Sequence, residues 1–314
     1  MDGVRFGVYV PQLKVDVATV LEQAQAAEAA GFDSFWLMDH LLAPGAPPCD
    51  TLESWTLLTA IACATTTLRL GHLVGCGPFR HPALLAKMAA TVDQISGGRL
   101  DLGLGWGSVE SELATFGFPV ATRRERSDAL GETLQILDRM FAGDPFDFTG
   151  TYFTLAGAYG LPRPVQQRIP VHIGGGGRQL TMPLVAEHAD WWNCIGSARD
   201  RLEELAPLRG TARISAQYAV GLLRRGEDRE HVTARIARRM PESAWGRPLV
   251  GTPPELVAQF RAERERGVEL CIVRFDDYGP AATLATFGSE VVAPLGAERR
   301  VLGAPTSPPS TPTR

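Results

Sequence analysis

Short apolar runs of strand length alternate along the chain with longer segments whose apolar residues recur at helical spacing. Behind Pro82, for example, Leu84, Met88 and Ile95 fall on one face of an expected helix, and proline is tolerated in a first helical turn. The pattern predicts strands at 4–10, 34–38, 68–74, 99–104, 170–173, 190–194, 214–223 and 270–275. It predicts helices at 17–30, 53–64, 82–96, 124–141, 179–188, 200–208, 253–266 and 280–292.

Three segments depart from this alternation. Residues 146–155 resemble a small β excursion around Gly150, and the polar segment 224–248 is too long for a turn, so a helical insertion is expected there. The tail, 303–314, is rich in proline, serine and threonine and lacks the apolar residues for a core, so disorder is expected. Residues 1–302 are expected to form a single domain.

The repeated strand–helix units predict an α/β fold, namely a closed (β/α)8 TIM barrel with insertions, and 314 residues are an ordinary length for one such barrel. A doubly wound open sheet is the main alternative, and it would place a ligand at a topological switch point. In a barrel, catalytic side chains gather where the strands end. The loops that follow the strands are therefore where a site is expected.

Composition and charge narrow the classes of partner. The chain is 45% hydrophobic and 21% charged with a formal net charge of −4, so no global field attracts nucleic acid or an anionic membrane. Its five cysteines form no CxxC pair, which is typical of reduced thiols and not of a disulfide framework or a metal site. Residues 1–10 lack the basic segment and long apolar core of a signal peptide, so none is expected, and no later apolar run is long enough to span a bilayer. We expect a cytoplasmic protein that acts on a small molecule, and its oligomeric state, a homodimer included, stays open.

Two stretches at expected strand ends suggest chemistry. SFWLMDH, 34–40, ends a strand in Asp39 and His40, two ionisable side chains on the loop side of the barrel. Gly174–Gly177 follow a strand and precede a helix, so their N–H groups and the helix N-terminus would favour an anion. Alternatively, Asp39 and His40 form a structural hydrogen-bonded pair, and Gly174–Gly177 form a flexible turn. GLGWG, 103–107, fits a dinucleotide fingerprint only loosely, so a nicotinamide site is not expected.

Longer motifs resemble the bacterial luciferase-like monooxygenase and oxidoreductase superfamily, in particular its deazaflavin-dependent branch. The motifs are GFDSFWLMDHLL (31–42), LRLGHLVGCGPFRHPALLAK (68–87), ISGGRLDLGLGWGSVESELATFGF (95–118) and IPVHIGGGGRQLTMPLVAEHADWWN (169–193). The likeness extends in order over residues 4–295, apart from the segment 224–248. It implies a TIM barrel and an oxidoreductase with a flavin or deazaflavin cofactor.

The resemblance also implies roles for matching residues. His40 corresponds to the catalytic histidine beside the central ring of the cofactor, and Asp39 to a residue at the ring edge. Leu73 and Val74 correspond to a bulge behind the ring, where family members carry a non-proline cis peptide. The residues implied to bind the cofactor are Asp39, Leu73, Val74, Gly75, Gly105, Trp106, Gly107, Gly174, Gly175, Gly176 and Gly177.

The cofactor expected from the resemblance depends on the end of the second strand. Relatives that use FMN commonly have Glu-His-His there, whereas this chain has Asp39-His40 followed by two leucines, as deazaflavin users do. The resemblance therefore favours coenzyme F-420, an 8-hydroxy-5-deazaflavin, with FMN as the alternative. It implies hydride transfer between C5 of the reduced cofactor and a small organic substrate, with His40 as the proton-transfer or hydrogen-bonding group. An FMN- and O2-dependent monooxygenase and a non-catalytic flavin-binding barrel stay open as alternatives.

The substrate is not readable from the sequence, but one class is disfavoured. Deazaflavin-dependent sugar-phosphate dehydrogenases of this family carry a glutamate where this chain has Ser108, and Lys14 and Lys87 are the chain's only lysines. Glucose 6-phosphate is therefore not expected as the substrate. Glu110 and Glu112 follow nearby, and the sequence assigns them no role. Tryptophans near strand ends favour an apolar or aromatic compound, although most of these rings are expected in the core.

Overall fold

Parallel strands close into a barrel in the computed structural model, which describes residues 4–296. In barrel order the strands are β1 (Arg5–Tyr9), β2 (Ser34–Leu37), β3 (Arg69–His72), β5 (Leu100–Gly105), β8 (Val171–Gly174), β9 (Trp191–Cys194), β10 (Arg213–Leu222) and β12 (Leu270–Phe275). The pairing of β12 with β1 closes the ring. The predicted (β/α)8 barrel is confirmed with every predicted strand in place, and the open sheet is excluded.

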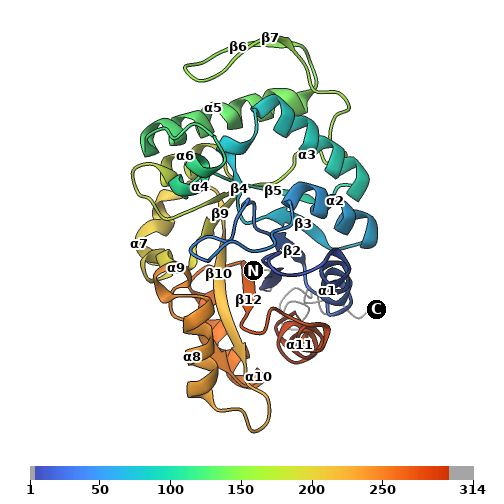
Figure 1. The fold of residues 1–314 in the computed structure, drawn as a ribbon, viewed down its shortest axis with the longest axis vertical. Coiled ribbons are helices and arrows are strands. Elements are labelled where there is room, and N and C mark those ends of the chain that lie inside the picture. Colours follow the sequence, from blue (N-terminus) through green and yellow to red (C-terminus); the bar gives the residue numbers. More distant parts are fainter. Residues whose placement is uncertain (1–3, 297–314) are drawn as a thin grey trace, which may run out of the picture.

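Helices surround the barrel (Figure 1). They are α1 (Val17–Ala29), α2 (Ser54–Ala64), α3 (Pro82–Ser96), α5 (Arg123–Ala142), α6 (Thr181–His188), α7 (Leu202–Leu205), α10 (Pro253–Glu265) and α11 (Ala281–Phe287). Two helix ends show typical caps: the Asp16 side chain accepts the N–H of Thr19 at the start of α1, and Gly97 ends α3 with φ of +67°. No helix within residues 4–296 has both the length and the apolar character needed to cross a membrane.

Two predicted helices differ from the structure in extent. The helix expected at 200–208 is the four-residue α7 between two 3₁₀ segments, η2 (Gly196–Arg201) and η3 (Ala206–Leu208). Pro207 explains the break, because it has no N–H to continue an α-helical ladder. The helix expected at 280–292 is α11 followed by a π-helical turn, η4 (Gly288–Val292).

Further elements decorate the barrel. The β excursion is a hairpin, β6 (Phe146–Thr149) and β7 (Thr154–Ala158), which lies outside α5 (Figure 1). The expected insertion contains α8 (Arg229–Arg239) and α9 (Glu242–Trp245), and β11 (Leu249–Gly251) follows it. The sequence pattern did not predict β4 (Gly75–Cys76), η1 (Gly77–Phe79) and α4 (Glu110–Thr115). The tail at 303–314 lies outside the described residues.

Side chains of the strands alternate between the helices and the barrel interior. Phe35 and Leu37 of β2 point outward and pack in the large core beneath the helices. Trp36 points inward, where it forms a second buried cluster with Tyr9 and Trp191. The interior is therefore filled by side chains, as expected for an eight-stranded barrel.

Charged and aromatic residues at the strand starts seal one end of the barrel. Arg69 donates two hydrogen bonds of 2.8 Å to the carboxylate of Asp101. The guanidinium carbons of Arg5 and Arg213 lie 4.8 and 4.2 Å from the ring centre of Trp191. We call these five residues the barrel floor.

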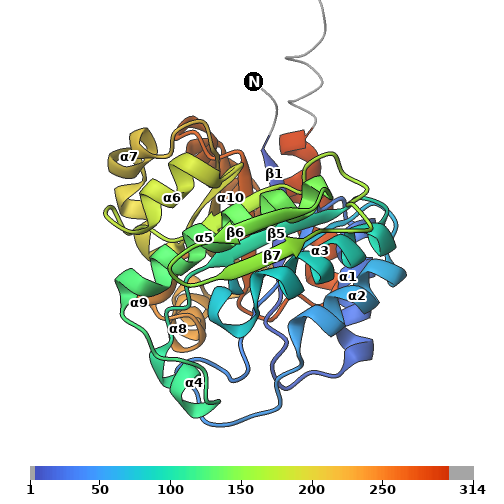
Figure 2. The ribbon, with the colours of Figure 1, turned by 90° about the horizontal axis from the view of Figure 1, so that it is seen from above.

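The strands end at the opposite face, which we call the barrel mouth. In Figure 2 the N-terminus and the start of β1 lie at one end of the barrel, and α4 and α9 lie at the other. The loop after β2 lies at this second end as well. Elements from three distant parts of the sequence thus meet at the mouth.

Candidate active site

His40 is held by a buried carboxylate from α4. Its Nδ1 lies 2.7 Å from Oε2 of Glu112, and Oε1 of Glu112 accepts the backbone N–H groups of Leu41, at 2.6 Å, and Leu42, at 3.2 Å. The Glu112 side chain is 2% exposed and that of His40 is 28% exposed. Two backbone donors favour the ionised carboxylate, which can only accept, so Nδ1 is the ring nitrogen that carries the proton. Within residues 4–296, Nε2 has no hydrogen-bond partner.

Asp39 lies beside His40 but is turned into the protein. Its carboxylate accepts hydrogen bonds from Ser54 Oγ at 2.7 Å, from the N–H of Cys76 at 2.8 Å and from Arg80 at 2.6 and 3.0 Å. Burial alone would raise the pKa of Asp39, but the neighbouring His72 and the Arg80 guanidinium bring that pKa below its usual value. Asp39 therefore anchors the β4–η1 segment, and its predicted contact with the ring edge stays a prediction.

The bulge after β3 carries the predicted cis bond. The peptide between Leu73 and Val74 is cis, which confirms the expectation from the family resemblance. Val74 packs where neighbouring glycines lack side chains: an added Cβ would lie 2.8 Å from its Cγ2 at Gly105 and 2.9 Å from its Cγ1 at Gly174. A Cβ on Gly103 would overlap the carbonyl oxygen of His72. At the mouth ends of β5 and β8, glycines at 103, 105 and 174 thus leave the space that the segment 72–74 occupies.

The glycine run after β8 forms a loop with free donors. Gly175 has φ of +134°, its N–H donates to Asn193 and its carbonyl accepts the indole N–H of Trp192 at 2.8 Å. The N–H groups of Gly176 and Gly177 have no acceptor within residues 4–296. We call 174–177 the anion loop, because such donors next to the N-terminus of α6 suit a negative charge.

Trp106 connects the anion loop to the end of β5. Its indole nitrogen lies 3.5 Å from Oγ1 of Thr181, the first residue of α6, and its ring lies 5.5 Å from the Arg126 guanidinium. An added Cβ on Gly176 would come 2.6 Å from the Cβ of Ala198, so this glycine also permits close packing of η2. The predicted residues of 105–107 and 174–177 are thus neighbours in space.

Two other histidines and four tryptophans belong to the core, and the expectation that most tryptophan rings are buried is confirmed. His72 and His172 are buried, and the His172 ring stacks on Trp191 with 5.3 Å between ring centres. Burial lowers the pKa of His72, although Asp39 opposes this effect. No group of three or more His, Cys, Asp or Glu side chains within 4–296 is arranged to hold a metal ion.

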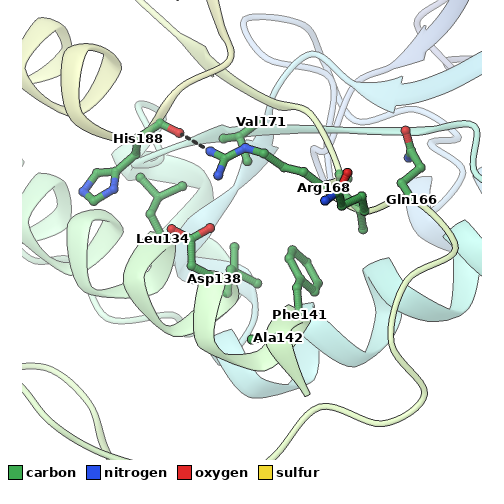
Figure 3. Close-up of a pocket in the computed structure, with 11 residues that line it drawn as sticks. Leu134, Asp138, Phe141, Ala142, Gln166, Arg168, Val171 and His188 are labelled. Atoms are coloured by element: carbon green, nitrogen blue, oxygen red, sulfur yellow. Dashed lines mark hydrogen bonds between the residues drawn. The ribbon is translucent and has the colours of Figure 1, made fainter. Parts of the chain in front are cut away.

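A cavity of about 850 Å³ lies away from these residues (Figure 3). Leu134 and Asp138 of α5 line one side, and Arg168, which donates to the carbonyl of His188 at 3.4 Å, lines the other. Val171 in the same lining stands at the start of β8. The cavity is therefore on the floor side of the barrel and is separate from the candidate active site.

Sequence reasoning did not assign a role to three residues at the mouth. Glu112 follows the GLGWG turn without an assigned role, and Arg274 lies near the end of the strand expected at 270–275. Trp245 lies in the insertion, which has no counterpart in the resemblance. The signal for Glu112 was its spacing from a strand end, because the loop after β5 must cross the mouth near the loop after β2.

Comparison with curated proteins gives matches of moderate identity. An F420-dependent glucose-6-phosphate dehydrogenase of Amycolatopsis mediterranei is 33% identical over 177 residues, which cover 54% of this chain and 50% of the relative. An F420-dependent hydroxymycolic acid dehydrogenase of Mycobacterium tuberculosis is 30% identical over 226 residues, which cover 71% of this chain and 58% of the relative. The chain thus spans about half the length of these two relatives.

Solved structures share the fold over nearly the whole chain. An F420-dependent secondary alcohol dehydrogenase in complex with an F420–acetone adduct superposes with a TM-score of 0.79 at 18% identity and covers 94% of this chain and 99% of its own. A riboflavin lyase with modified FMN and riboflavin gives 0.78 at 16% identity, covering 95% and 92%. At these identities the likeness concerns the fold. The sequence profile of the luciferase-like monooxygenase family matches residues 4–210, and the chain belongs to this family of oxidoreductases.

Proposed function

We propose that the protein is a coenzyme F-420-dependent oxidoreductase that transfers a hydride between C5 of the reduced deazaflavin and a small organic substrate with an apolar or aromatic body. The observation that carries this proposal is the His40–Glu112 pair, which presents a free imidazole nitrogen at the mouth of a luciferase-like barrel. Support comes from two relatives whose names state F420-dependent dehydrogenases.

The mouth fits a flat ring with a phosphorylated side chain. The wall around Val74, where Gly105 and Gly174 add no side chains of their own, offers an apolar surface against which a tricyclic ring can stack. The free N–H groups of Gly176 and Gly177 would hold the phosphate. When bound, the deazaflavin supplies the carbon that accepts or gives the hydride. The chain's own task is to hold the ring against this wall and to exclude water from it.

His40 has a defined chemical role in this proposal. Because Glu112 holds the proton on Nδ1, neutral His40 presents Nε2 as an acceptor. Nε2 can take a proton from a substrate hydroxyl as it becomes a carbonyl, or return that proton in the reverse reaction. The buried carboxylate also stabilises the imidazolium formed in the first case.

An FMN-dependent monooxygenase is the second candidate, because a protein of the same fold holds modified FMN. The end of β2 favours the deazaflavin: Asp39 and His40 are followed by Leu41 and Leu42, not by a second histidine. Glucose 6-phosphate is not the proposed substrate, although one relative carries that name. Ser108 stands where such enzymes carry their glutamate, as the family resemblance implies.

Equilibrium titration of the purified protein with F-420 and, separately, with FMN tests the cofactor. We expect F-420 to bind at least tenfold more tightly, as followed by deazaflavin absorbance and by isothermal titration calorimetry. Tighter binding of FMN would establish the monooxygenase instead. Binding of neither would contradict the proposal. Binding of F-420 without its reduction by any alcohol, or reoxidation of reduced F-420 by any ketone, in a broad panel would indicate a non-catalytic barrel.

A further inference from the structure

Arg274 brings an uncompensated positive charge into the barrel mouth. It lies on β12, where Leu270 and Ile272 face the barrel interior and Val273 and Phe275 face the helices. Because side chains alternate along a strand, Arg274 faces inward as well. It stands at the carboxyl end of its strand, where ligands of this fold bind.

The guanidinium rests against an aromatic corner. Its central carbon lies 4.9 Å from the ring centre of Trp245 and 6.0 Å from that of Tyr9, and the two rings are 5.6 Å apart. Trp245 comes from α9, the insertion helix at the mouth. The insertion therefore completes a surface made of one cation and two aromatic faces.

Within residues 4–296, Arg274 has no carboxylate partner. Its Nε is buried without a hydrogen bond, and none of the ionisable groups that act on it, namely Tyr9, Tyr278 and Arg239, is a carboxylic acid. Burial lowers the pKa of Arg274. The nearest acids along the chain are engaged elsewhere, Asp276 with Arg235 and Asp277 with Arg224. A buried charge without a partner is costly, so a ligand anion would relieve that cost.

We propose that Arg274 binds a carboxylate on the substrate, so that the protein acts on an aromatic or apolar carboxylic acid. This inference rests on the proposed function and names its substrate class. A planar guanidinium matches a carboxylate through two parallel hydrogen bonds, and a single cation matches a single negative charge better than a phosphate dianion. Tyr9 and Trp245 would contact the apolar body of the acid.

The register of the strands gives the orientation of this substrate. Tyr9 pairs with Trp36 and Val8 with Val273, so Arg274 lies level with Tyr9 and Trp36. His40 lies four residues beyond Trp36, on the second strand away from β12, a lateral distance of about 10 Å. The carboxylate therefore binds deeper than the reacting carbon, which lies near His40. Such a spacing suits an aryl or alkyl acid whose hydroxyl or carbonyl group is several bonds from the carboxylate.

Calorimetric titration with three probes tests the proposal, with and without saturating F-420. The probes are phenylacetate, its neutral analogue phenylacetamide, and phenyl phosphate. We expect phenylacetate to bind at least tenfold more tightly than either of the others. Equal binding of phenylacetate and phenylacetamide would overturn the proposal, and preference for phenyl phosphate would assign the site to phosphate esters instead.

Variants connect this preference to one side chain. Arg274→Gln should abolish the preference for phenylacetate, and Arg274→Lys should keep part of it, because lysine retains the charge without the planar fork. Arg224→Gln is the matched control at the neighbouring strand end, since Arg224 is paired with Asp277, and it should keep the full preference. An unchanged preference in Arg274→Gln would overturn the proposal.

Arg274 could bind the cofactor instead of the substrate, and the affinity of the Arg274→Gln variant for F-420 distinguishes the two. The dissociation constant of F-420 should stay within twofold in Arg274→Gln. A tenfold loss of F-420 affinity would assign Arg274 to the cofactor and overturn the inference about the substrate. Failure of F-420 to bind the unaltered protein would refute the proposed function alone, because the phenylacetate preference is measured without the cofactor as well.

Discussion

His40 and Glu112 show how the site depends on a pair of residues that are 72 positions apart in sequence. The strand end delivers His40, and the short α4 delivers the carboxylate that fixes its tautomer and ring orientation. Partners of this kind are commonly as important for function as the groups they orient. The contribution of Glu112 should therefore appear only through His40.

Glu112→Gln should lower turnover about tenfold to a hundredfold, because an amide can also donate to Nδ1 and release the tautomer. His40→Ala should lower it roughly a hundredfold or more, the usual scale for a positioned proton-transfer group. F-420 affinity should stay within twofold in both variants, as measured by absorbance titration. The double variant should be no slower than His40→Ala alone, because the two residues act as one unit.

Glu110→Gln is the control for this experiment. Glu110 lies on the same helix, and its exposed side chain pairs with Arg126 at 2.8 Å. It should keep turnover within about twofold, because glutamine can still accept a hydrogen bond from Arg126 and residue 110 does not contact His40. Multiplicative losses in the His40 and Glu112 double variant would show that Glu112 acts on the reaction independently.

Single site residues were predictable where they directly follow an apolar run of strand length. The apolar run before Asp39 and His40 correctly placed both at the mouth. The sequence could not reveal that Arg80, 41 positions later, occupies the Asp39 carboxylate, because only the fold brings them together. Glu112 escaped for a related reason: a six-residue helix has too few positions to show an amphipathic period.

At the scale of elements, the bulge after β3 depends on the absence of a side chain at Gly103 of β5. A Cβ on Gly103 would overlap the backbone of His72, so β3 and β5 could not keep their present separation. Backbone cannot rotate away as a long side chain can. The position of the bulge after β3 is thus fixed by a glycine on the neighbouring strand β5.

Gly103→Ala should destabilise the protein by roughly 3 kcal/mol or more, at the upper end of the range for overpacking. Gly97→Ala is the matched comparison, because Gly97 has φ of +67° but a Cβ there meets nothing within 4 Å. That variant should cost only the left-handed penalty of about 1 kcal/mol. Urea unfolding of both variants measures the difference, and similar losses would show that the bulge can move.

Helices and strands were predictable from the spacing of apolar residues. The prediction failed where a proline or a close backbone contact determined the structure. The strands are apolar runs that stand out in the sequence. The helix expected at 200–208, by contrast, is broken by Pro207. The insertion was predicted as helical, but its position was not. A Cβ on Gly196 would overlap the backbone of Trp245, so this close approach fixes α9 on the loop after β9. No periodic pattern encodes such a contact.

At the scale of the whole molecule, the barrel was predictable because its repeat is long and regular. The site was less predictable, since it combines loops from distant units with an insertion outside the repeat. The contacts of the barrel floor were easier to predict than those of the mouth. Arg69 and Asp101 come from β3 and β5, neighbouring strands whose pairing already fixes their distance.

Asp101→Asn should lower the free energy of unfolding at pH 7 by about 3 to 5 kcal/mol, because it leaves the Arg69 guanidinium poorly paired. Burial would raise the pKa of Asp101, but the nearby His172 imidazole and the hydrogen-bonded Arg69 guanidinium bring that pKa below its usual value. The carboxylate's contribution is therefore complete above about pH 4 and is lost as the pH falls through the lowered pKa. The difference between variant and unaltered protein should shrink accordingly when urea unfolding is repeated near pH 3.

Binding of F-420 should be unaffected by Asp101→Asn, because the floor is at the opposite end from the mouth. Asp144→Asn is the control: its exposed carboxylate lies 3.3 Å from Arg163, and its loss should cost at most about 1 kcal/mol. A loss of F-420 affinity that exceeds tenfold in folded Asp101→Asn would show that the two ends are coupled.

The sealed floor has a consequence for how this barrel can diversify. The floor residues Arg5, Arg69, Asp101, Trp191 and Arg213 all lie on strands, so their contacts do not depend on the length or sequence of any loop after a strand. Insertions and exchanges in those loops leave these contacts in place. Evolution, or a library that randomises α9 and the loop after β2, can therefore explore new substrates while the scaffold stays folded.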